Sequence, residues 1–257
     1  MGTAQHGVGM PGWVELSVTD LPAAQSFYSQ LLGWTFQELP GGPLPYYIIF
    51  NKDRVIGGLT GKWNEYQPTQ WLTYLQSDNI DASIEAINSS GGKTYMPPTD
   101  IPGGKFTVAS GIADEPFGVV QSEGFFEAFG DVGDLIWFEL QSTKDVTATV
   151  DFYRAVFGWK TSVLEDMPYV TFGLKEGQEN QVGGVYSAAG DDFPGYLDGQ
   201  AQWAVTFHVS DVQAVADAAV ALGGQSLSID KGTPYGDFAM FRDPQGAFFV
   251  VMTPTPH

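Results

Sequence analysis

The sequence predicts an α+β fold made of four βαβββ units, and internal repetition is the first observation behind this prediction. The segment "SFYSQLLGW", which starts at Ser26, recurs as "DFYRAVFGW" from Asp151. The segments that follow Trp71 and Trp203 both read as a strand, a polar cap and a helix ending in Gly-Gly. A repeat of this size defines the architecture of a whole chain, so we expect the two halves to be duplicates.

Hydrophobic spacing predicts one helix in each unit. Asp20 and Asp145 stand where the N-cap of a helix needs an acceptor, and Gly33 and Gly158 stand where its end needs a left-handed residue. Between these signals, apolar residues recur at intervals of three and four, which is the pattern of a single helix face. In the first unit they are Ala24, Phe27, Tyr28, Leu31 and Leu32.

Short β-rich segments separated by turn residues follow each helix. After the first helix they are "TFQEL", "YYIIF" and "RVIGGL". Two such units give eight strands and two helices in each half, and we expect two domains, residues 1–125 and 126–257. The stretch from Gln121 to Asp134, rich in glycine and acidic residues, is the expected link between them.

Composition limits the possible partners. Thirty acidic residues against eleven Lys and Arg give a formal charge of -19, which repels the phosphates of nucleic acids and anionic lipid head groups. The chain has no cysteine, so it lacks a thiolate nucleophile and a Cys-ligated metal site. Neither a signal peptide nor a membrane span is expected. We expect a cytoplasmic monomer or homodimer whose partner is a small molecule.

The paired units, the helices in "DLPAAQSFYSQLLGW" and "DVTATVDFYRAVFGW", and the ending "FRDPQGAFFVV" resemble the vicinal oxygen chelate superfamily of glyoxalases, extradiol dioxygenases and bleomycin-resistance proteins. The resemblance covers nearly the whole chain and is closest to two-domain actinobacterial glyoxalase-like proteins. It implies tandem vicinal oxygen chelate domains, each with an eight-stranded sheet curled into a half-barrel around a ligand, often with a divalent metal. Metalloenzymes and metal-free binding proteins share this fold, so function must be inferred from the site.

The positions at which this resemblance implies metal ligands do not carry them. Counted back from the helix caps, the first-strand position falls on Trp13, Phe138 and Ala204, and in the second unit on Trp71 or Leu72. The position of the last-strand carboxylate falls on Val250 and, in the first half, on Ser122. An iron dioxygenase needs two His and a carboxylate on neighbouring strands, and only His208 of the three His lies in a predicted element. We expect no metal and no other cofactor.

Two glutamates recur at one place in the repeat. Glu15 follows Trp13 in "WVELSVTD", and Glu139 follows Trp137 in "WFELQSTKD", where one additional residue indicates a β-bulge or a shifted cap. Alternate residues of a strand share a face, so each Glu is expected beside its Trp on the concave side. Three interpretations stay open: a solvated carboxylate near the rim, a polar anchor or general base whose pKa burial would raise, and a ligand of a metal.

Other candidate ligand contacts have structural alternatives. The four first-strand tryptophans could line the cavities, or some could pack in the core; they are Trp13, Trp71, Trp137 and Trp203. His208 in "VTFHVSD" is a candidate contact as well, although a lone His on a strand is more often a packed or hydrogen-bonded residue.

The resulting hypothesis is a glyoxalase-like and bleomycin-resistance-like protein that binds a small, partly aromatic molecule, with Glu15 and Glu139 as polar anchors. The alternative is a lyase or isomerase of the glyoxalase type, in which a Glu removes a proton α to a carbonyl, with or without a divalent metal. A structural or protein-interaction module is a third possibility. The sequence leaves open whether the protein is an enzyme.

Overall fold

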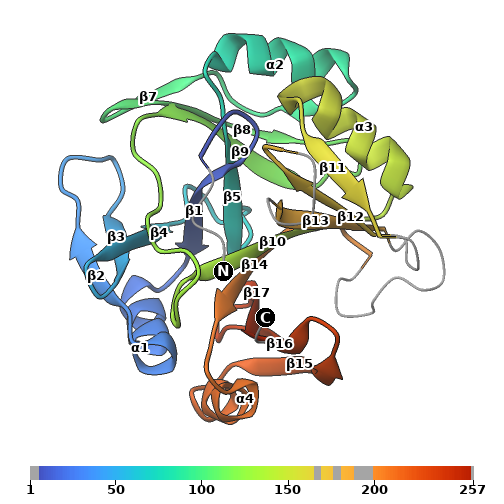
Figure 1. Ribbon diagram of the computed structural model, residues 1–257. Coiled ribbons are helices and arrows are strands. Elements are labelled where there is room, and N and C mark those ends of the chain that lie inside the picture. Colours follow the sequence, from blue (N-terminus) through green and yellow to red (C-terminus); the bar gives the residue numbers. More distant parts are fainter. Residues whose placement is uncertain (1–5, 165–168, 176–180, 188–198, 256–257) are drawn as a thin grey trace.

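A computed structural model describes residues 6–164, 169–175, 181–187 and 199–255. Each half of the chain forms one strongly curved sheet with two helices on its convex side, and the two sheets pack with their convex sides together (Figure 1). The expected α+β fold with tandem half-barrels is therefore confirmed. No helix in the described ranges is long and apolar enough to span a membrane.

The first half supplies sheet A. Its elements are β1 (Pro11–Val18), α1 (Leu21–Leu32), β2 (Thr35–Glu38), β3 (Tyr46–Asn51), β4 (Arg54–Gly61), β5 (Gln70–Gln76), α2 (Ile80–Ser89), β6 (Lys93–Thr94), β7 (Thr99–Ile101), β8 (Gly104–Ser110) and β9 (Pro116–Ser122). The strands lie in the order β2-β3-β4-β1-β5-β9-β8-β6, and β7 also pairs with β8. Sheet A thus has nine strands rather than eight.

The second half supplies sheet B, which has the expected eight strands. Its elements are β10 (Leu135–Ser142), α3 (Val146–Phe157), β11 (Lys160–Val163), β12 (Tyr169–Gly173), β13 (Gln181–Ser187), β14 (Gln202–His208), α4 (Val212–Ala221), β15 (Gln225–Thr233), β16 (Gly236–Arg242) and β17 (Phe248–Pro254). The order β11-β12-β13-β10-β14-β17-β16-β15 matches sheet A strand for strand. In both sheets the first strand of each unit lies at the centre.

The additional strand of sheet A has a local cause. In sheet B the strand after the helix is continuous, as β15, whereas in sheet A its counterpart is divided into β6 and β7. The segment between these two strands contains Pro97 and Pro98. Proline has no backbone N–H to donate to a strand ladder, so the pairing with β8 stops there and resumes at Thr99.

The helix ends follow the sequence signals. The Asp20 carboxylate accepts a hydrogen bond from the backbone N–H of Ala23, and Gly33 ends α1 with φ of 74°. Asp145 accepts from two backbone N–H groups of α3, and Gly158 ends that helix with φ of 70°. The additional residue of "WFELQSTKD" lies between the end of β10 and Asp145. It therefore lengthens the connection rather than bulging the strand.

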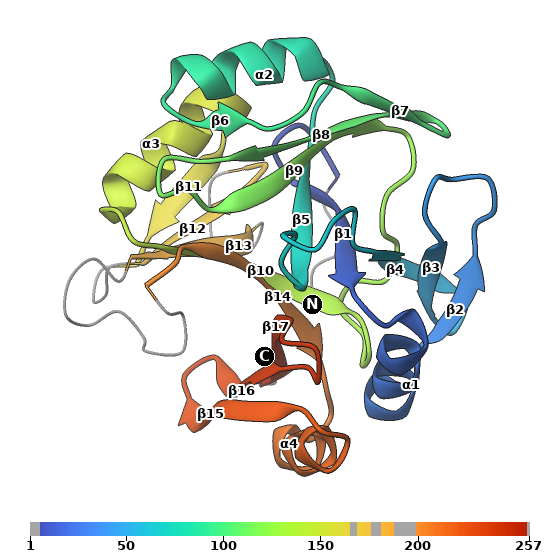
Figure 2. The same cartoon turned by 180° about the vertical axis from the view of Figure 1, so that it is seen from behind.

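One hydrophobic core lies between the two sheets. Helix α1 packs against α4, and α2 packs against α3, so each unit meets a unit of the other half (Figure 2). The ring of Phe207 on β14 lies 4.8 Å from that of Trp34 and 5.4 Å from that of Trp71. Both sheets therefore bury their convex faces in a common core, and their concave faces point away from each other.

Polar bonds cross this core in matched pairs. The indole Nε1–H of Trp34 donates to the carbonyl of Gly133, 2.8 Å away, and that of Trp159 donates to the carbonyl of Gly9, 2.7 Å away. Each half thus binds the turn that precedes the first strand of the other half. The connection between the halves, residues 123–134, includes the position between residues 125 and 126 at which the domain boundary is expected.

Two buried groups of Trp, Tyr and acid, which we call the clasps, also join the halves. In one, Trp71 Nε1–H donates to the Tyr28 hydroxyl, which donates to Asp243 from the other half, with both distances 3.1 Å. In the other, Trp203, Tyr153 and Glu115 make the same bonds, at 3.3 and 2.9 Å. Burial raises the pKa of both acids above the usual range and outweighs their hydrogen bonds.

Candidate functional site

The concave face of sheet A holds a group of polar side chains at its centre, of which Tyr74 is buried and the others are partly buried. Glu15 on β1 lies between Gly58 of β4 and Leu72 of β5 in the strand register. Trp13 shares its face, as alternation along a strand requires, and pairs with Tyr74. Tyr46 reaches the same place from β3. We call Trp13, Glu15, Tyr46 and Tyr74 site A.

Hydrogen bonds connect the members of site A into a short chain. The Trp13 indole Nε1–H donates to the Tyr46 hydroxyl, 3.0 Å away, and the Tyr74 hydroxyl donates to Glu15 Oε1, 3.2 Å away. Tyr46 is also hydrogen-bonded to the Glu15 carboxylate. Burial raises the pKa of Glu15, and the two tyrosine hydrogen bonds oppose that rise. Burial and the nearby carboxylate raise the pKa of both tyrosines well above the usual value, so both phenols stay protonated.

Glycines make room for these rings. A Cβ atom at Gly58 would overlap the hydroxyl of Tyr46, and one at Gly118 of β9 would overlap the ring of Tyr74. Neither glycine has a φ that requires glycine. Their absence of a side chain is therefore a packing requirement of site A.

Sheet B carries a related group, which we call site B: Trp137, Glu139, Gln141 and Tyr169. The Trp137 indole donates to the Tyr169 hydroxyl at 2.9 Å, and that hydroxyl donates to Glu139 Oε2 at 3.3 Å. Here the second donor to the carboxylate is Gln141 Nε2, 3.1 Å from Oε1. Burial again raises the pKa of Glu139 against the hydrogen bonds from Gln141 and Tyr169.

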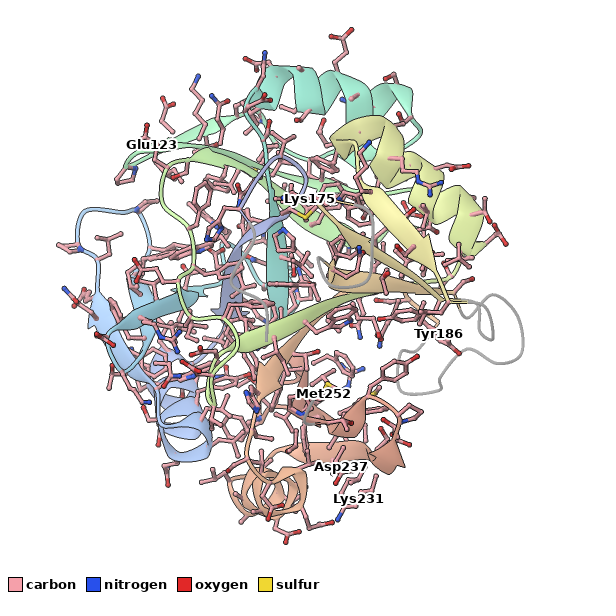
Figure 3. All side chains as sticks on the ribbon, viewed as in Figure 1. Glu123, Lys175, Tyr186, Lys231, Asp237 and Met252 are labelled. Atoms are coloured by element: carbon pink, nitrogen blue, oxygen red, sulfur yellow. The ribbon has the colours of Figure 1, made fainter. Side chains whose placement is uncertain are left out.

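Apolar side chains surround both sites on the concave faces. In sheet A, Trp13 packs with a cluster formed by Leu72, Tyr74, Phe106, Val108 and Val120. In sheet B the corresponding cluster is Ala204, Leu227, Phe238, Met240, Phe248 and Val250. Figure 3 shows Tyr186 on the β13 side and Met252 and Asp237 on the β16–β17 side of sheet B. Several of these side chains are only partly buried, so each site is a polar point in an apolar surface.

Not all residues expected to line the cavities lie at these sites. Trp13 and Trp137 are each bonded to the tyrosine that contacts the glutamate. Trp71 and Trp203 are buried in the shared core, where they belong to the clasps. The difference from the expectation arises because Trp71 pairs with Leu16, whereas Leu72 pairs with Glu15. The tryptophans of the second and fourth units therefore point to the convex side.

His208 lies at the end of β14, away from site B along the strand. Its Nδ1 is hydrogen-bonded to the carbonyl oxygen of Gly130, 2.8 Å away. Its backbone N–H donates to Asp134 and its carbonyl accepts from Gly133. These bonds hold the end of the connection between the halves. The arrangement gives His208 a structural contact and no contact with Glu139.

The donors of site A do not fit a divalent metal. Site A offers one carboxylate and two phenols, and a phenol would have to lose its proton to serve as a strong ligand, which the raised pKa of both tyrosines opposes. In the described ranges, no three His, Asp or Glu side chains are grouped to hold a metal ion. The strand register also corrects the expected position of the last-strand ligand in the first half. Gly118 lies opposite Tyr74 in sheet A, and Val250 lies opposite Thr206, the counterpart of Tyr74, in sheet B. Gly118, rather than Ser122, is thus the counterpart of Val250.

A separate open cleft of about 470 Å³ lies at the far end of β5. Gln76, Asp78, Ser122, Glu123 and Phe125 are among its lining residues, and neither glutamate of the two sites reaches it. The Gln76 amide Nε2 lies 3.3 Å from Nδ1 of His6. Acids and amides thus share the lining of the cleft with glycine and apolar residues, and the lining includes no member of site A.

Sequence reasoning missed the tyrosines and the glutamine. A signal was present for one pair, because Tyr46 and Tyr169 each directly follow a proline in matching segments of the two halves, "PYYIIF" and "PYVTFGL". The paired glycines of "VIGGL" and "VGGVY" gave a second signal. Tyr74 and Gln141 have no counterpart of the same type in the other half, so repetition could not reveal them.

Comparison with known proteins links both halves to one family. Residues 11–120 match the model of the glyoxalase/bleomycin resistance protein/dioxygenase superfamily, and residues 137–252 match that of a glyoxalase-like domain. A putative glyoxylase, CFP32, from Mycobacterium bovis is 31% identical over 98% of each chain. The anthracycline biosynthesis protein DnrV from Streptomyces peucetius is 30% identical over 95% of this chain and 93% of its own.

Solved structures with the same fold are more distant in sequence. The Mn(II)-bound glyoxalase from Novosphingobium aromaticivorans superposes with a TM-score of 0.64 at 15% identity, over 96% of this chain and 82% of that one. The 2,3-dioxygenase LapB from Pseudomonas sp. KL28 gives 0.62 at 12% identity, over 99% and 95%. At these identities the likeness concerns the fold.

Proposed function

Since the chain belongs to the glyoxalase, bleomycin resistance protein and dioxygenase superfamily, we propose that it binds a small, partly aromatic molecule in its half-barrels without a metal ion. One observation carries this proposal. Each concave face holds a glutamate whose hydrogen bonds come from a tyrosine and a second neutral donor. Apolar and aromatic side chains surround that glutamate.

This arrangement suits recognition of a small molecule. Ligand sites in proteins are mostly apolar, with a few polar groups that fix the orientation of the ligand. Glu15 and Glu139 are the orienting groups in the proposal, and Trp13 and Trp137 act through the tyrosines that they hold. Anthracyclines are polycyclic aromatic molecules, so the similarity to the anthracycline biosynthesis protein DnrV supports an aromatic ligand.

The net charge of the chain limits which ligand charges are compatible with binding. A net charge of -19 disfavours the approach of anions to the protein as a whole. A carboxylate at the centre of each site adds to that local repulsion. The proposed ligand is therefore neutral or cationic, and nucleic acid and anionic membranes remain poor candidates.

Binding of naphthol, a small neutral aromatic probe, tests the proposal. The indole N–H signals of Trp13 and Trp137 in the NMR spectrum, assigned by Trp→Phe variants, report occupancy of each site. The expected result is saturable shifts of these signals, with affinity reduced about tenfold in Glu15→Gln and Glu139→Gln at the respective site. Glu38→Gln, at an exposed position on β2, is the matched control. Unchanged affinity in both site variants would contradict the role of the glutamates.

Metal analysis tests whether the protein binds its ligand without a metal ion. Protein purified from metal-containing medium is expected to hold far less than one metal ion per chain. Binding of naphthol should be the same with and without a chelator. Stoichiometric metal that is lost in Glu15→Gln or Glu139→Gln would refute metal-free binding, because those carboxylates would then be ligands.

A lyase or isomerase is a second candidate, favoured by the raised pKa of both glutamates. A carboxylate with a raised pKa is a stronger base, and a tyrosine hydroxyl beside it can stabilise a developing enolate. The test is exchange of the acetyl protons of methyl naphthyl ketone in deuterated water, followed by NMR. Exchange above the buffer rate that both Glu→Gln variants abolish would favour catalysis, and exchange at the buffer rate would favour binding alone.

A further inference from the structure

The open cleft at the far end of β5 contains a buried side chain with an unused polar atom. Gln76 is only 5% exposed, and its amide Nε2 lies 3.3 Å from Nδ1 of His6. Its Oε1 has no hydrogen-bond partner among the described residues, yet it is not sealed from solvent, since the fully buried atoms without a partner belong to other side chains. Because Gln76 lines the cleft, this oxygen is an acceptor available to a ligand.

Packing fixes the direction of the Gln76 side chain. A Cβ atom at Gly12 of β1 would overlap that side chain, and Gly12 has no backbone φ that requires glycine. The absence of a side chain at Gly12 therefore makes room for Gln76. This contact holds the amide beside β1 at the start of the cleft.

The lining of the cleft carries negative charge and no positive charge. Asp78 and Glu123 are exposed lining residues, and the lining includes no lysine or arginine. Figure 3 shows Glu123 near the end of β7. Neither carboxylate forms a salt bridge within the described ranges. Burial lowers the pKa of His6, so at neutral pH its ring does not offset these charges. The local charge favours a cation.

The start of helix α2, next to the cleft, does not offer a site for an anion. The backbone N–H of Ile80 donates to Gln121 Oε1, 3.0 Å away, and that of Ala82 donates to Asn79 Oδ1, 3.1 Å away. Anions bind helix N-termini through such N–H groups when these are free. Here the groups are used, so the two carboxylates determine the charge preference of the cleft.

The cleft also has an aromatic wall and enough space for a small molecule. Phe125 is half-buried and lines the cleft, and its ring is stacked on that of His6 with 4.8 Å between the ring centres. An aromatic ring attracts organic cations and packs against their apolar parts. The cleft volume of about 470 Å³ lies within the range of small-molecule sites, about 300–1,000 Å³.

The second half shows that the repeated fold does not require these acids. Gly104 pairs with Ser122 in sheet A as Gly236 pairs with Pro254 in sheet B, and the residues before the caps of α2 and α4 also correspond. Asp78, Gly103 and Glu123 of the cleft are thereby replaced by Ser210, Tyr235 and Thr255. The acids are therefore not needed to form the fold and can serve a ligand.

We propose that the cleft is a second binding site, which takes an organic ammonium ion: Asp78 and Glu123 supply the opposite charge, and Gln76 Oε1 accepts a hydrogen bond from the ammonium group. An aromatic or apolar part of the same molecule packs on Phe125. This site contains no member of site A or site B, so the inference goes beyond the proposed function.

Phenethylamine, which is positively charged at neutral pH, and phenethyl alcohol, its neutral counterpart of similar size, test the proposal. The backbone amide NMR signals of Gly103 and Gly104 report the cleft, and the Trp13 indole signal reports site A. The amine is expected to shift the two glycine signals at concentrations about tenfold lower than the alcohol, and added salt should weaken its binding.

Substitutions in the lining should weaken binding of the amine at the cleft. The expected loss of affinity is about threefold in Asp78→Asn and in Glu123→Gln, and about tenfold when the two are combined. Gln76→Leu, which removes the acceptor, should cost about fivefold. Glu85→Gln, at an exposed position on α2, removes the same charge away from the cleft and should leave the affinity unchanged. The indole signals of Trp34 and Trp159 in the core show that each variant is folded.

The outcomes separate this inference from the proposed function. Equal affinities of the amine and the alcohol at the glycine signals, or an unchanged amine affinity in the doubly substituted Asp78 and Glu123 variant, would overturn the inference. A shift of the Trp13 signal by the amine without shifts of the glycine signals would also overturn it, while supporting ligand binding at site A. Binding of the amine at the cleft of a protein that does not bind naphthol would support the inference and refute the proposed function.

Discussion

Replacing Tyr28 with Phe tests whether the clasps hold the two halves together. The hydroxyl of Tyr28 accepts from Trp71 and donates to Asp243, and all three side chains are at most 4% exposed. Its removal costs a hydrogen bond to a carboxylate, about 1.5–3 kcal/mol, and leaves the buried indole N–H without its partner, about 1–3 kcal/mol. Because the surrounding side chains can adjust and recover part of this loss, we expect the free energy of unfolding to fall by about 3 kcal/mol.

Urea unfolding followed by tryptophan fluorescence measures this change, and thermal unfolding should show a decrease in Tm of about 6–12 °C. Tyr153→Phe, in the matching clasp, is expected to have a similar effect. Tyr66→Phe is the control, since Tyr66 is 87% exposed and its hydroxyl makes no contact across the core. A loss below about 1 kcal/mol in Tyr28→Phe, within the range of ordinary surface substitutions, would refute the reasoning.

The pH dependence of the same variant gives a second check. Burial raises the pKa of Asp243, and the Tyr28 hydroxyl opposes that rise. A carboxyl with a raised pKa in the folded state stabilises the fold below its unfolded pKa, and this contribution is lost as pH rises through the folded pKa. Removing the hydroxyl raises that pKa further, so the destabilisation by Tyr28→Phe should be larger at about pH 8 than at about pH 4. A destabilisation by Tyr28→Phe that is independent of pH would contradict the coupling between the Tyr28 hydroxyl and Asp243.

Three further substitutions have defined outcomes. Gly58→Ala places a Cβ against the tyrosine hydroxyl of site A and should weaken naphthol binding about tenfold, whereas Gly61→Ala, where the space is open, should not; equal affinities would contradict the packing argument. Arg54→Ala removes the cation from a fully buried carboxylate and should cost about 3 kcal/mol in urea unfolding, whereas Lys93→Ala breaks an exposed pair and should leave the midpoint unchanged. Similar urea-unfolding midpoints for Arg54→Ala and Lys93→Ala would contradict the difference between the buried and the exposed ion pair. Since the pKa of Glu15 is raised, the stability of Glu15→Gln relative to the unchanged protein should increase from about pH 4 to about pH 8, and a decrease would refute the burial of that carboxylate.

Much of the fold could be predicted because its signals are local. The cap at Asp20 and the glycine at position 33 bound a helix whose apolar stripe is complete in the sequence, and the repeat carried the same assignment to the third unit. The division of β6 from β7 also has a local signal, in Pro97 and Pro98, which the expectation of eight strands in each half did not take into account. Pairing of α1 with α4 could not be predicted, because contacts between distant segments leave no periodicity in either of them.

The orientation of β5 shows why part of the site was beyond the sequence. Trp71, Leu72, Thr73, Tyr74 and Leu75 are all buried, since the convex side of β5 faces the common core and its concave side faces a second apolar cluster. A strand buried on both faces loses the alternation that reveals direction. Trp71 therefore could not be assigned to either side, and Tyr74 could not be connected to Glu15. On β1, the alternation of Glu15 with apolar neighbours was sufficient to place Glu15 with Trp13.

The bonds between the halves have the form of an isologous interface, in which each contact is made twice with the roles exchanged. Trp34 binds the turn at Gly133 as Trp159 binds the turn at Gly9, and Tyr28 reaches Asp243 as Tyr153 reaches Glu115. Contacts of this kind are those of a symmetric homodimer of a single ancestral half. Residues 123–134 join the two halves in one chain, which makes this association intramolecular and independent of protein concentration. Once assembly no longer required two identical copies, a substitution such as Thr206 or Gln141 could be fixed in one site without being imposed on the other.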